Sequence, residues 1–588
     1  MTQPALTPTS IPAQDTLSTS TARTVFAAIL RFRVERPVPG ARKREWEETL
    51  EYNYATIWES IADSVGDRDA VVCGDQRRSW TEYENRASRL ASAFAGAGLG
   101  IGSKVGLYLY NSTEYLEAQF ASMKGRGAAV NINYRYLDEE LLYLLDNSDA
   151  EALVFHTSLG ERVARVMERA PKVKLWIQVD DGGEPVPGAL DYEAVIAGHD
   201  PAARITRSGD DLYMLYTGGT TGMPKGVMYE TGSMCQSFLE LSYPIYGYPV
   251  PEAGQIAAVA KERWDADAPT RSLPACPLMH GTGMWLGALV AHLGGGLITL
   301  LSSRALDSEE LWQLAEREKC TQLVIVGDTF AKPMLTALET AKSEGRAYDL
   351  SSIRFIISSG VMWTSEVKKQ LLDWHDFTLI DAMGSTEGGM GTQITTRGNI
   401  GKTARFAMSP TTKVFSEDGR EIVPGSGEAG MVAAGGAVPK GYFKDEKKTA
   451  ATFKTIDGVR YSFPGDWALV EADGSLTLLG RGSNCINTAG EKVYPEEVEE
   501  AVKSHPDVID CLVVGVEDEK FGQRVTGVAS LRPGSDVDPD TIRQFTKENL
   551  AAYKVPKDLF IVEHVQRAPN GKADYDWARK TVEEATSL

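Results

Sequence analysis

Residues 216–227 read Tyr-Thr-Gly-Gly-Thr-Thr-Gly-Met-Pro-Lys-Gly-Val, and they follow an apolar run, Leu212 to Tyr216, that is typical of a β-strand. The glycines permit positive φ, so consecutive backbone N–H groups can point into one concavity. The threonine hydroxyls add donors, and Lys225 adds a mobile charge. Such a loop suits a polyphosphate, although its composition alone fits an ordinary turn equally well. It is not a Walker loop, because no Gly-Lys-Ser/Thr stands at the required spacing.

The size and charge of the chain limit what it can do. With 588 residues it exceeds one ordinary hydrophobic core, so we expect two or more domains. Its formal net charge is −20, from 61 basic and 81 acidic residues, which disfavours non-specific binding to nucleic acid or to an anionic membrane. An anionic substrate would therefore need local positive charge from loops and single lysines.

The cysteines and the apolar stretches point to a cytoplasmic protein without integral membrane association. The six cysteines are scattered and contain no C-x-x-C pair, which fits a reducing compartment and argues against disulfides and a zinc site. No secretory signal is visible near the N-terminus. The most membrane-like stretch, residues 281–301, contains His292 and many glycines, so we expect it to be buried core.

Strand-like and helical patterns alternate from about residue 54 onward, which predicts an α/β fold with largely parallel sheets. This alternation indicates a fold class and not a function. Residues 1 to about 22 are expected to be a mobile tail, and 23–51 have helical character. The expected strands are Val105–Tyr110, Ala152–Phe155, Leu175–Val179, Leu212–Tyr216, Leu323–Gly327, Arg354–Ser358, Val508–Val516 and Val525–Leu531, and a helix is expected over Thr541–Leu550.

The 216–227 stretch resembles the phosphate loop of the adenylate-forming superfamily, which includes acyl-CoA synthetases, peptide-synthetase adenylation domains and beetle luciferases. The resemblance extends from about residue 50 to the C-terminus. It implies a large N-terminal α/β domain of parallel-rich sheets with helices and a small mobile C-terminal α/β domain. We therefore expect an extension at 1–50, an ATP- and acyl-binding domain at 51–482 and a mobile domain at 483–588. The implied ligands are ATP, Mg²⁺ and the co-substrate coenzyme A.

A second motif, Asp381-Ala382-Met383-Gly384-Ser385-Thr386-Glu387, contains a carboxylate suited to Mg²⁺, which prefers oxygen ligands. By composition alone it is a loop acid like many others. The resemblance makes Glu387 the magnesium ligand and Thr386 a donor to the α-phosphate. Met383 departs from the family, which usually has an aromatic residue stacked on adenine here, although a thioether can also cover a ring face.

Three further segments complete the implied nucleotide site. Asp466 matches the ribose-binding aspartate, and Arg481 would contact the ribose or phosphate side. Ser483 stands at the family's hinge position, where Asp or Lys is common, and Gly490 would line the path of the thiol. Lys572, which follows Asn-Gly near the end of the chain, matches the catalytic lysine of adenylation. Without the resemblance, Asp466 and Lys572 would be ordinary turn residues.

The acyl side of the site is implied by two stretches. His280, Gly281 and Met284 lie in Pro-Leu-Met-His-Gly-Thr-Gly-Met-Trp, where a histidine beside apolar residues is otherwise a core residue. Ser359 and Gly360 end an apolar strand, where small residues let a flat ring approach the backbone. Gly281, Gly283 and Gly287 would leave room for a bulky acyl group, unless they serve backbone packing. The expected catalytic residues are Lys572, Glu387, Thr386 and Thr217. The expected nucleotide- and coenzyme-binding residues are Gly218, Gly219, Thr220, Thr221, Gly222, Lys225, Gly360, Asp381, Met383, Gly384, Ser385, Asp466, Arg481 and Gly490.

The region around His280 has no acid for an amino-acid ammonium, which favours an acyl-CoA ligase over an amino-acid adenylation domain. The sequences around Arg481, Glu491 and Trp363 look most like actinobacterial fatty and steroid side-chain acyl-CoA synthetases. We therefore expect a small-molecule carboxylic acid of lipid or sterol-side-chain type as substrate, with a medium- or long-chain fatty acid or an aryl acid as alternatives. A non-enzymatic protein that binds acyl groups or nucleotide is the remaining alternative. A homodimer is also an open expectation.

Overall fold

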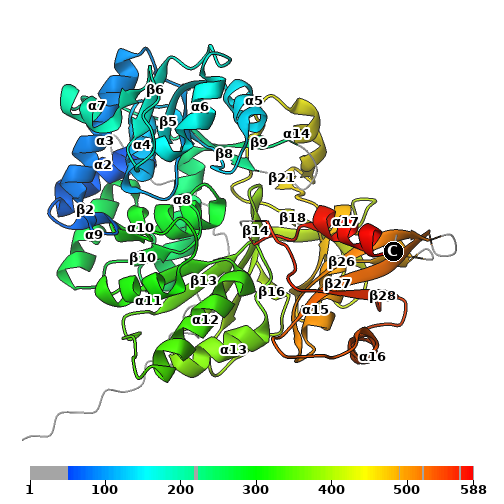
Figure 1. The fold of residues 1–588 in the computed structure, drawn as a ribbon. Coiled ribbons are helices and arrows are strands. Elements are labelled where there is room, and N and C mark those ends of the chain that lie inside the picture. Colours follow the sequence, from blue (N-terminus) through cyan, green and yellow to red (C-terminus); the bar gives the residue numbers. More distant parts are fainter. Residues whose placement is uncertain (1–50, 218–222, 489–490, 519–521, 569–570, 587–588) are drawn as a thin grey trace, which may run out of the picture.

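The computed structural model describes residues 51–217, 223–488, 491–518, 522–568 and 571–586. The expectations for the tail and the extension at 1–50 lie outside these residues. The described chain forms a large α/β domain and a smaller α/β domain that lies against it, coloured orange to red in Figure 1. The α/β class predicted from the alternating patterns is confirmed.

The first sheet of the large domain is parallel throughout, with strand order β4-β3-β5-β6-β7. Its strands are β3 (Lys104–Tyr108), β4 (Ala128–Asn131), β5 (Ala150–His156), β6 (Leu175–Val179) and β7 (Leu190–Asp191). The helices along this stretch of chain are α4 (Thr113–Lys124), α5 (Asp138–Ser148), α6 (Gly160–Met167) and α7 (Tyr192–Gly198). The helix α4 begins at the side chain of Ser112, which accepts a hydrogen bond from the backbone N–H of Tyr115. The expected strands at 105–110, 152–155 and 175–179 are confirmed.

The second sheet has 15 strands and consists of a parallel half and an antiparallel half. The parallel half contains β1 (Asp69–Cys73), β10 (Arg271–Pro274), β11 (Leu297–Leu300), β12 (Gln322–Ile325), β13 (Phe355–Ser359) and β14 (Thr378–Ser385), and β2 (Gln76–Ser79) pairs antiparallel at its edge. The helices of this part are α2 (Tyr54–Val65), α3 (Trp80–Gly96), α8 (Thr231–Tyr246), α9 (Ile256–Asp265), α11 (Ser308–Arg317), α12 (Gly327–Ser343) and α13 (Ser365–Trp374). The strands expected at 323–327 and 354–358 occur here with shifted ends.

The antiparallel half differs from the expected parallel arrangement. It contains β15 (Gly388–Thr395), β16 (Arg405–Met408), β17 (Thr412–Phe415), β18 (Ala429–Ala434), β20 (Phe453–Ile456), β21 (Val459–Ser462), β22 (Asp466–Val470) and β23 (Ser475–Arg481). A separate antiparallel sheet is formed by β8 (Leu212–Thr217), β9 (Lys225–Glu230) and β19 (Gly441–Tyr442). Several of these strands follow one another through connections of a few residues, which are too short for the crossover that a parallel pair needs.

The apolar stretch at 281–301 is buried core, as predicted. It forms a π-helix over Thr282–Leu289, the helix α10 (Val290–Leu293) and the strand β11. His292 is buried and makes a 3.0 Å hydrogen bond with the carbonyl oxygen of Ala70. Within the described ranges, every helix is too short or too polar to span a bilayer.

The small domain is built on a five-stranded sheet with helices on it. Its elements are β24 (Ile486–Thr488), β25 (Glu491–Val493), α15 (Pro495–Lys503), β26 (Val508–Asp518), β27 (Gly522–Leu531), α16 (Pro539–Asn549), β28 (Asp558–Val562) and α17 (Tyr575–Thr586). The strands expected at 508–516 and 525–531 and the helix at 541–550 are confirmed. Pro495 occupies the first turn of α15, where its missing N–H costs no helical hydrogen bond.

Polar contacts join the two domains. The ammonium of Lys332 on α12 donates to the carbonyl oxygen of Ile509 at 2.8 Å. Lys492 forms a 2.7 Å ion pair with Glu417 and lies over the ring of Trp467. Strand β23 belongs to the large sheet up to Arg481, whereas β24 begins the small sheet at Ile486. The residues between them therefore form the covalent junction.

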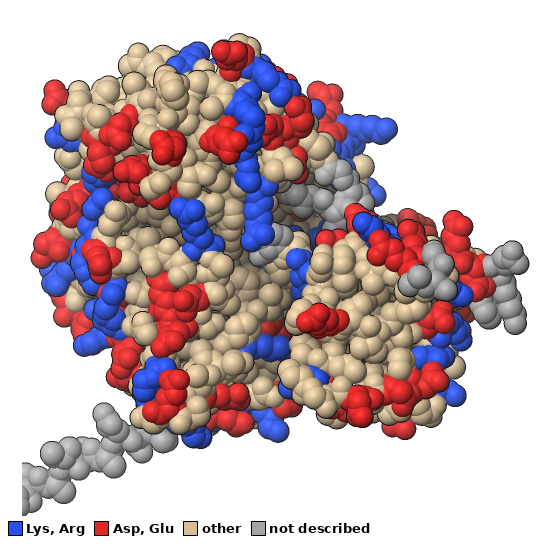
Figure 2. Space-filling view, in the orientation of Figure 1, with Lys and Arg blue, Asp and Glu red and all other residues tan. Residues whose placement is uncertain are grey.

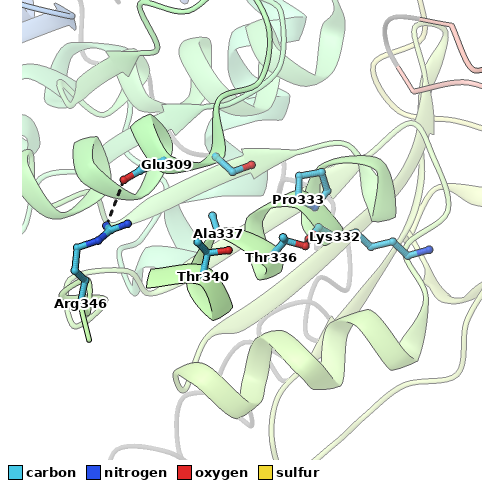
Figure 3. Close-up of a pocket in the computed structure, with 8 residues that line it drawn as sticks. Glu309, Lys332, Pro333, Thr336, Ala337, Thr340 and Arg346 are labelled. Carbon is cyan, nitrogen blue, oxygen red and sulfur yellow. Dashed lines mark hydrogen bonds and ion pairs between the residues drawn. The ribbon is translucent and has the colours of Figure 1, made fainter. Parts of the chain in front are cut away.

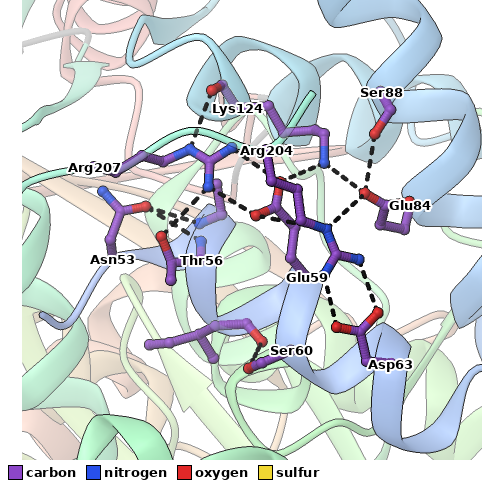
Figure 4. Close-up of polar contacts among 12 residues, drawn as sticks. Asn53, Thr56, Glu59, Ser60, Asp63, Glu84, Ser88, Lys124, Arg204 and Arg207 are labelled. Atoms are coloured by element: carbon purple, nitrogen blue, oxygen red, sulfur yellow. Dashed lines mark hydrogen bonds and ion pairs between the residues drawn. The ribbon is translucent and has the colours of Figure 1, made fainter. Parts of the chain in front are cut away.

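A buried network of charges ties the N-terminal helices together (Figure 4). The carboxylate of Glu59 on α2 accepts hydrogen bonds from Arg207 at 2.8 and 2.9 Å and from Lys124 at 2.6 Å. Lys124 also donates to Glu84 at 2.7 Å.

On the molecular face in Figure 2, acidic and basic side chains intermingle over both domains.

Candidate active site

The predicted phosphate loop joins two paired strands. Thr217, the last residue of β8, lies opposite Lys225, the first residue of β9. Gly218, Gly219, Thr220, Thr221 and Gly222 lie outside the described residues, so their predicted role stays a prediction. The ammonium of Lys225 pairs with the carboxylate of Asp445, which also caps the helix α14 (Glu446–Thr452). This pairing lowers the pKa of Asp445.

A buried amide connects the phosphate loop to the stretch that carries His280. The side chain of Asn131 at the end of β4 donates to the carbonyl oxygens of Tyr216 and Met279 at 2.8 and 2.7 Å. It also accepts from the backbone N–H of Tyr216 at 2.7 Å. One side chain therefore fixes the strand before the loop and the residue before His280.

Thr386 and Glu387 form the tight turn between β14 and β15. The hydroxyl of Tyr442 donates to Oε1 of Glu387 at 2.6 Å. The turn's backbone is held by two more hydroxyls: Tyr229 donates to the carbonyl oxygen of Thr386 at 3.0 Å, and Ser462 to that of Glu387 at 2.8 Å. Glu387 is thus the carboxylate of a rigid turn.

Asp466 and Arg481 face each other across β22 and β23. Nε of Arg481 lies 3.0 Å from Oδ1 of Asp466. The other oxygen, Oδ2, is buried and has no hydrogen-bond partner among the described residues. A buried acceptor without a partner is costly, so this atom is suited to the hydroxyl of a ligand.

Lys572 is carried by a turn of the small domain that touches the large domain. Its carbonyl oxygen accepts from the backbone N–H of Ala568 at 2.9 Å, and Arg567 is fixed by two hydrogen bonds of 2.6 and 2.7 Å to Asp510. At Gly571, where φ is +77°, a Cβ atom would lie 3.1 Å from the side chain of Thr329 on α12. The tip of the turn therefore rests on the large domain.

The charges of Lys572, Arg481, Asp466, Glu387 and His280 influence one another. Lys572 keeps solvent-exposed surface, but the surrounding protein and the charge of Arg481 lower its pKa, against the attraction of Glu387 and Asp466. Burial and the charge of Lys572 lower the pKa of His280 to about 4, so this imidazole is neutral at pH 7. Burial raises the pKa of Asp466. The structure thus brings five residues predicted for the site into one electrostatic cluster.

The acyl-side residues meet at the start of the π-helix. A Cβ atom on Gly360, where φ is +92°, would lie 3.6 Å from the hydroxyl of Thr282, next to His280 and Gly281. Ser359 donates to the carbonyl oxygen of Ala382 at 2.7 Å. Trp285 is half-buried and donates to the hydroxyl of Tyr213 at 2.8 Å. Its ring lies near those of Tyr229 and Phe238.

The glycines of this stretch serve packing more than space. A Cβ atom would lie 2.5 Å from the carbonyl oxygen of Pro277 at Gly283, and 2.6 Å from the Cβ of Pro274 at Gly287. At Gly281 it would lie 3.3 Å from Trp285. Protein atoms therefore already occupy the room that these glycines leave, and the alternative of backbone packing is favoured.

The side chains of several other predicted site residues already make contacts within the protein. Met284 is 1% exposed in the large-domain core, and Met383 packs with Met390 and Phe406. The carboxylate of Asp381 is buried and pairs with Lys368 at 2.9 Å. Gly384 packs tightly against Gly388, and the hydroxyl of Ser385 accepts from the backbone N–H of Glu387 at 3.1 Å. Their ligand contacts stay predictions, as do the hinge at Ser483 and the role of Gly490, which lies outside the described residues.

A hollow of about 510 Å³ lies between α11 and α12, apart from the residues predicted for the site (Figure 3). An ion pair of 3.3 Å between Glu309 and Arg346 borders it, and Lys332 extends from it toward the small domain. Its lining residues are Ser308, Glu309, Lys332, Pro333, Thr336, Ala337, Thr340 and Arg346.

The donor set around Glu387 fits Mg²⁺ brought in with a polyphosphate. In the described part of the chain, no group of three or more His, Cys, Asp or Glu side chains is arranged to hold a metal ion. Mg²⁺ commonly binds through one or two carboxylates and takes its other ligands from water and phosphate. With Oε1 of Glu387 engaged by Tyr442, the second oxygen of that carboxylate is suited to such an ion.

Comparison with known proteins agrees with this geometry. Residues 58–443 match the family of AMP-binding enzymes, and residues 497–572 match the AMP-binding enzyme C-terminal domain. The chain therefore belongs to the AMP-binding enzymes, the adenylate-forming superfamily that the sequence resembles. The two-domain α/β fold predicted from that resemblance is confirmed.

Two relatives with similar sequences are CoA ligases. The chain is 40% identical to the 3-oxocholest-4-en-26-oate–CoA ligase of Rhodococcus rhodochrous over 535 residues, which cover 90% of this chain and 95% of that protein. It is also 40% identical over 541 residues to a medium/long-chain-fatty-acid–CoA/3-oxocholest-4-en-26-oate–CoA ligase of Mycobacterium tuberculosis, covering 90% and 96%. The crystal structure of the anthranilate CoA ligase AuaEII in complex with anthranoyl-AMP has the same fold, with a TM-score of 0.78, 21% identity, and coverage of 92% and 99%.

Sequence reasoning missed several residues around the site. Tyr442 and Asp445 are about 55 and 220 residues from their partners Glu387 and Lys225, and no local spacing indicates either contact. Glu496, an acid in the first turn of α15, lies against Arg481, whose backbone N–H is 3.4 Å from its Oε1. Only contacts in the folded chain could identify these residues.

Proposed function

We propose that this protein is an AMP-forming acyl-CoA synthetase that activates a lipid or sterol-side-chain carboxylic acid with ATP and transfers the acyl group to coenzyme A. The observation that carries the proposal is the cluster of Lys572, Glu387, Asp466, Arg481 and neutral His280, which come from separate segments of two domains. The named relatives are CoA ligases of fatty acids and of a sterol-derived acid.

The first half-reaction joins two anions. An oxygen of the substrate carboxylate attacks the α-phosphorus of ATP, and the bond from that phosphorus to the pyrophosphate oxygen breaks. Lys572 supplies positive charge between the carboxylate and the α-phosphate, which lowers the barrier by holding and neutralising both groups. Lys225 and the loop before it would hold the outer phosphates. Mg²⁺ at Glu387 would neutralise charge on the leaving pyrophosphate.

The nucleoside end is held by Asp466 and Arg481. Oδ2 of Asp466, which has no hydrogen-bond partner among the described residues, would accept a ribose hydroxyl, while Arg481 fixes the other carboxylate oxygen at 3.0 Å. Ser359, Gly360 and the backbone at Met383 and Gly384 would border adenine and the acyl group. Because His280 is neutral at pH 7, it would contact the acyl carboxyl region without adding charge.

The second half-reaction needs Lys572 to leave. The thiolate of coenzyme A attacks the acyl carbon, and the bond to the AMP oxygen breaks. We propose that the small domain turns about Ser483, which withdraws Lys572 and brings the backbone near Gly490 to the thiol path. Polar contacts between the domains, such as the Lys332–Ile509 hydrogen bond, are compatible with such a motion.

The acyl class is supported by the relatives more than by the glycines. Medium- or long-chain fatty acids and aryl acids are the alternative substrates. Trp285, within the π-helix, is half-buried and is held by the hydroxyl of Tyr213. The non-enzymatic alternative is disfavoured because Lys225, Glu387, Asp466, Arg481 and Lys572 are all present.

The test is pyrophosphate release with ATP and Mg²⁺ over fatty, aryl and sterol-side-chain acids, each with and without coenzyme A. We expect coenzyme-A-dependent turnover with fatty or sterol-side-chain acids, and its loss in Lys572→Ala. Turnover only with an amine acceptor would move the enzyme to another branch of the family. Silence on every acid, despite ATP binding, would favour the non-enzymatic alternative.

We also propose that the enzyme works in the cytoplasm, and a homodimer stays an open expectation for its solution state. All six cysteines are unpaired, and four of them are buried. Light scattering across a concentration series measures the mass directly. A monomer at every concentration would contradict the dimer.

A further inference from the structure

One segment contacts both Glu387 and Lys225, the two charged residues predicted to bind the metal and the outer phosphates. We call residues 440–445 the strap. Its backbone is fastened to β9: the N–H of Lys440 donates to Met228 at 2.7 Å, and the N–H of Phe443 donates to Gly226 at 2.8 Å. Gly441 and Tyr442 pair with Met228 and Val227. The strap is therefore fixed to the strand that begins with Lys225.

The strap contacts Glu387 through Tyr442. The tyrosine is 6% exposed, and its ring packs 5.5 Å from that of Phe453. Its hydroxyl donates to Oε1 of Glu387 at 2.6 Å, a short bond typical of a carboxylate acceptor. Among the described residues, no hydrogen bond reaches Oε2. Tyr442 therefore restricts the rotation of the carboxylate and leaves its second oxygen available.

The same strap meets Lys225 through Asp445, which pairs with its ammonium. The backbone N–H of Lys448 donates to the other oxygen of Asp445 at 2.9 Å, so this carboxylate is fixed at the helix start. The two groups assigned to the metal and to the outer phosphates are thus held in register by residues three positions apart. No spacing in the sequence around Glu387 or Lys225 indicates this arrangement.

We propose that Tyr442 is a positioning residue for the metal: it orients Glu387 so that the second carboxylate oxygen is ready for the Mg²⁺ that accompanies ATP. The inference rests on the proposed function, because it takes Glu387 as the metal ligand. Outer partners that orient a ligating group commonly account for 10- to 100-fold in metal affinity. The Tyr442 hydroxyl contacts Glu387, so Tyr442 would act through that carboxylate.

The experiment measures ATP binding by calorimetry without acid or coenzyme A, so that no turnover occurs. Mg²⁺ is titrated at fixed ATP, and a parallel series contains EDTA. The variants are Tyr442→Phe, which removes only the hydroxyl, and Glu387→Gln. Tyr83→Phe is the matched control, because Tyr83 is also a buried tyrosine, and its hydroxyl donates to the carbonyl oxygen of Leu116 at 3.1 Å, in the N-terminal helices.

We expect Tyr442→Phe to raise the Mg²⁺ concentration for half-maximal binding about 10-fold, while ATP affinity in EDTA changes less than about twofold. Glu387→Gln should shift the Mg²⁺ requirement further, and Tyr83→Phe should not shift it. Thermal unfolding of each variant checks that the fold is retained. The aromatic ring that Tyr442→Phe leaves in place keeps the contact with Phe453.

The possible outcomes distinguish the role of Tyr442 from the assignment of Glu387 as the metal ligand. A shift in Glu387→Gln without one in Tyr442→Phe overturns the inference and leaves the metal assignment intact. No shift in either variant removes Glu387 as the metal ligand. An equal loss of ATP affinity with and without Mg²⁺ in Tyr442→Phe makes the hydroxyl a general packing group, which also overturns the inference.

Discussion

The network around Glu59 and the cluster around Asp466 both gather opposite charges, but they treat them differently. In the network, Glu59 is bound by Arg207 and Lys124, and Lys124 by Glu84 as well. In the cluster, Oδ2 of Asp466 is buried without a partner among the described residues, and Lys572 keeps solvent-exposed surface. The network is complete within the protein, whereas the cluster leaves positions for a ligand.

The pKa shifts express the same contrast. Burial opposes ionisation of Glu59, but the hydrogen bonds and charges of Arg207 and Lys124 outweigh it and lower its pKa. At Asp466, burial outweighs the attraction of Arg481 and raises the pKa. A charged group that the protein does not fully stabilise has more to gain from a bound nucleotide. Of these two regions, the one whose charges the protein compensates incompletely is the cluster predicted to bind the nucleotide.

The largest expected effect concerns the complete network. Lys124→Ala removes the shared cation of Glu59 and Glu84 and leaves buried carboxylates under-compensated, so the free energy of unfolding should fall by about 3–5 kcal/mol. Urea unfolding followed by tryptophan fluorescence measures it, and the KM for ATP should stay unchanged. A loss below about 1 kcal/mol would mean that this network behaves like surface ion pairs.

Lys572→Ala should slow the reaction and leave the free energy of unfolding nearly unchanged, the reverse of what is expected for Lys124→Ala. Removing a charge that acts on the transition state commonly costs about 10²–10³ in rate, so adenylation should slow by that factor with little change in unfolding. Pyrophosphate release measures the rate. Lys580→Ala, at an exposed helix lysine of the same domain, is the control. A normal rate in Lys572→Ala would contradict the assignment of this lysine.

Asp466→Asn should weaken ATP binding roughly 10-fold or more, since a hydrogen bond to a charged group contributes about 1.5–3 kcal/mol. Calorimetry with ATP and with its 2′- and 3′-deoxy forms tests whether the ribose hydroxyls are involved. The variant should bind all three with similar affinity, whereas the parent should prefer ATP. An equal preference in both would place the ribose elsewhere.

The smallest effect is on pH dependence. Because His280 has a pKa of about 4, its charge stays constant above pH 5, and kcat/KM should show no transition near 6.5 from this residue. In the proposed mechanism Lys572 acts as a cation, and its pKa is lowered. Activity should therefore fall as the pH rises, and this alkaline decline should begin at a pH below the usual lysine pKa of about 10.5. Lys572→Arg should remove this alkaline decline. A transition near 6.5 that disappears in His280→Gln would contradict a neutral histidine.

Much of the parallel architecture could be predicted from the sequence. Apolar runs bounded by polar residues mark buried parallel strands, and Leu175–Val179 was expected with the bounds observed for β6. The antiparallel half was missed because strands such as β16 (Arg405–Met408) are short and half-exposed, with mixed composition. Local composition does not distinguish such strands from loops.

The candidate site likewise contains residues that the sequence predicted and residues that it did not. The convergence of Asp466, Arg481 and Lys572 followed from the family resemblance, because their spacing alone marks only turns. The sequence could not predict which side chains are occupied by contacts within the protein. Asp381 pairs with Lys368, and Met383 packs in the core, and in both cases the partners come from other elements. The strap was missed for the same reason.

The turn that carries Lys572 reaches the large domain through a tip contact at Thr329, while the chain itself connects the domains near Ser483. In the proposed function, the covalent connection would make Lys572 an intramolecular reagent, and the junction would set its effective concentration at the adenylation site. For short flexible connections this concentration is of the order of millimolar. A small domain supplied as a separate polypeptide would have to reach that concentration to replace the tethered lysine.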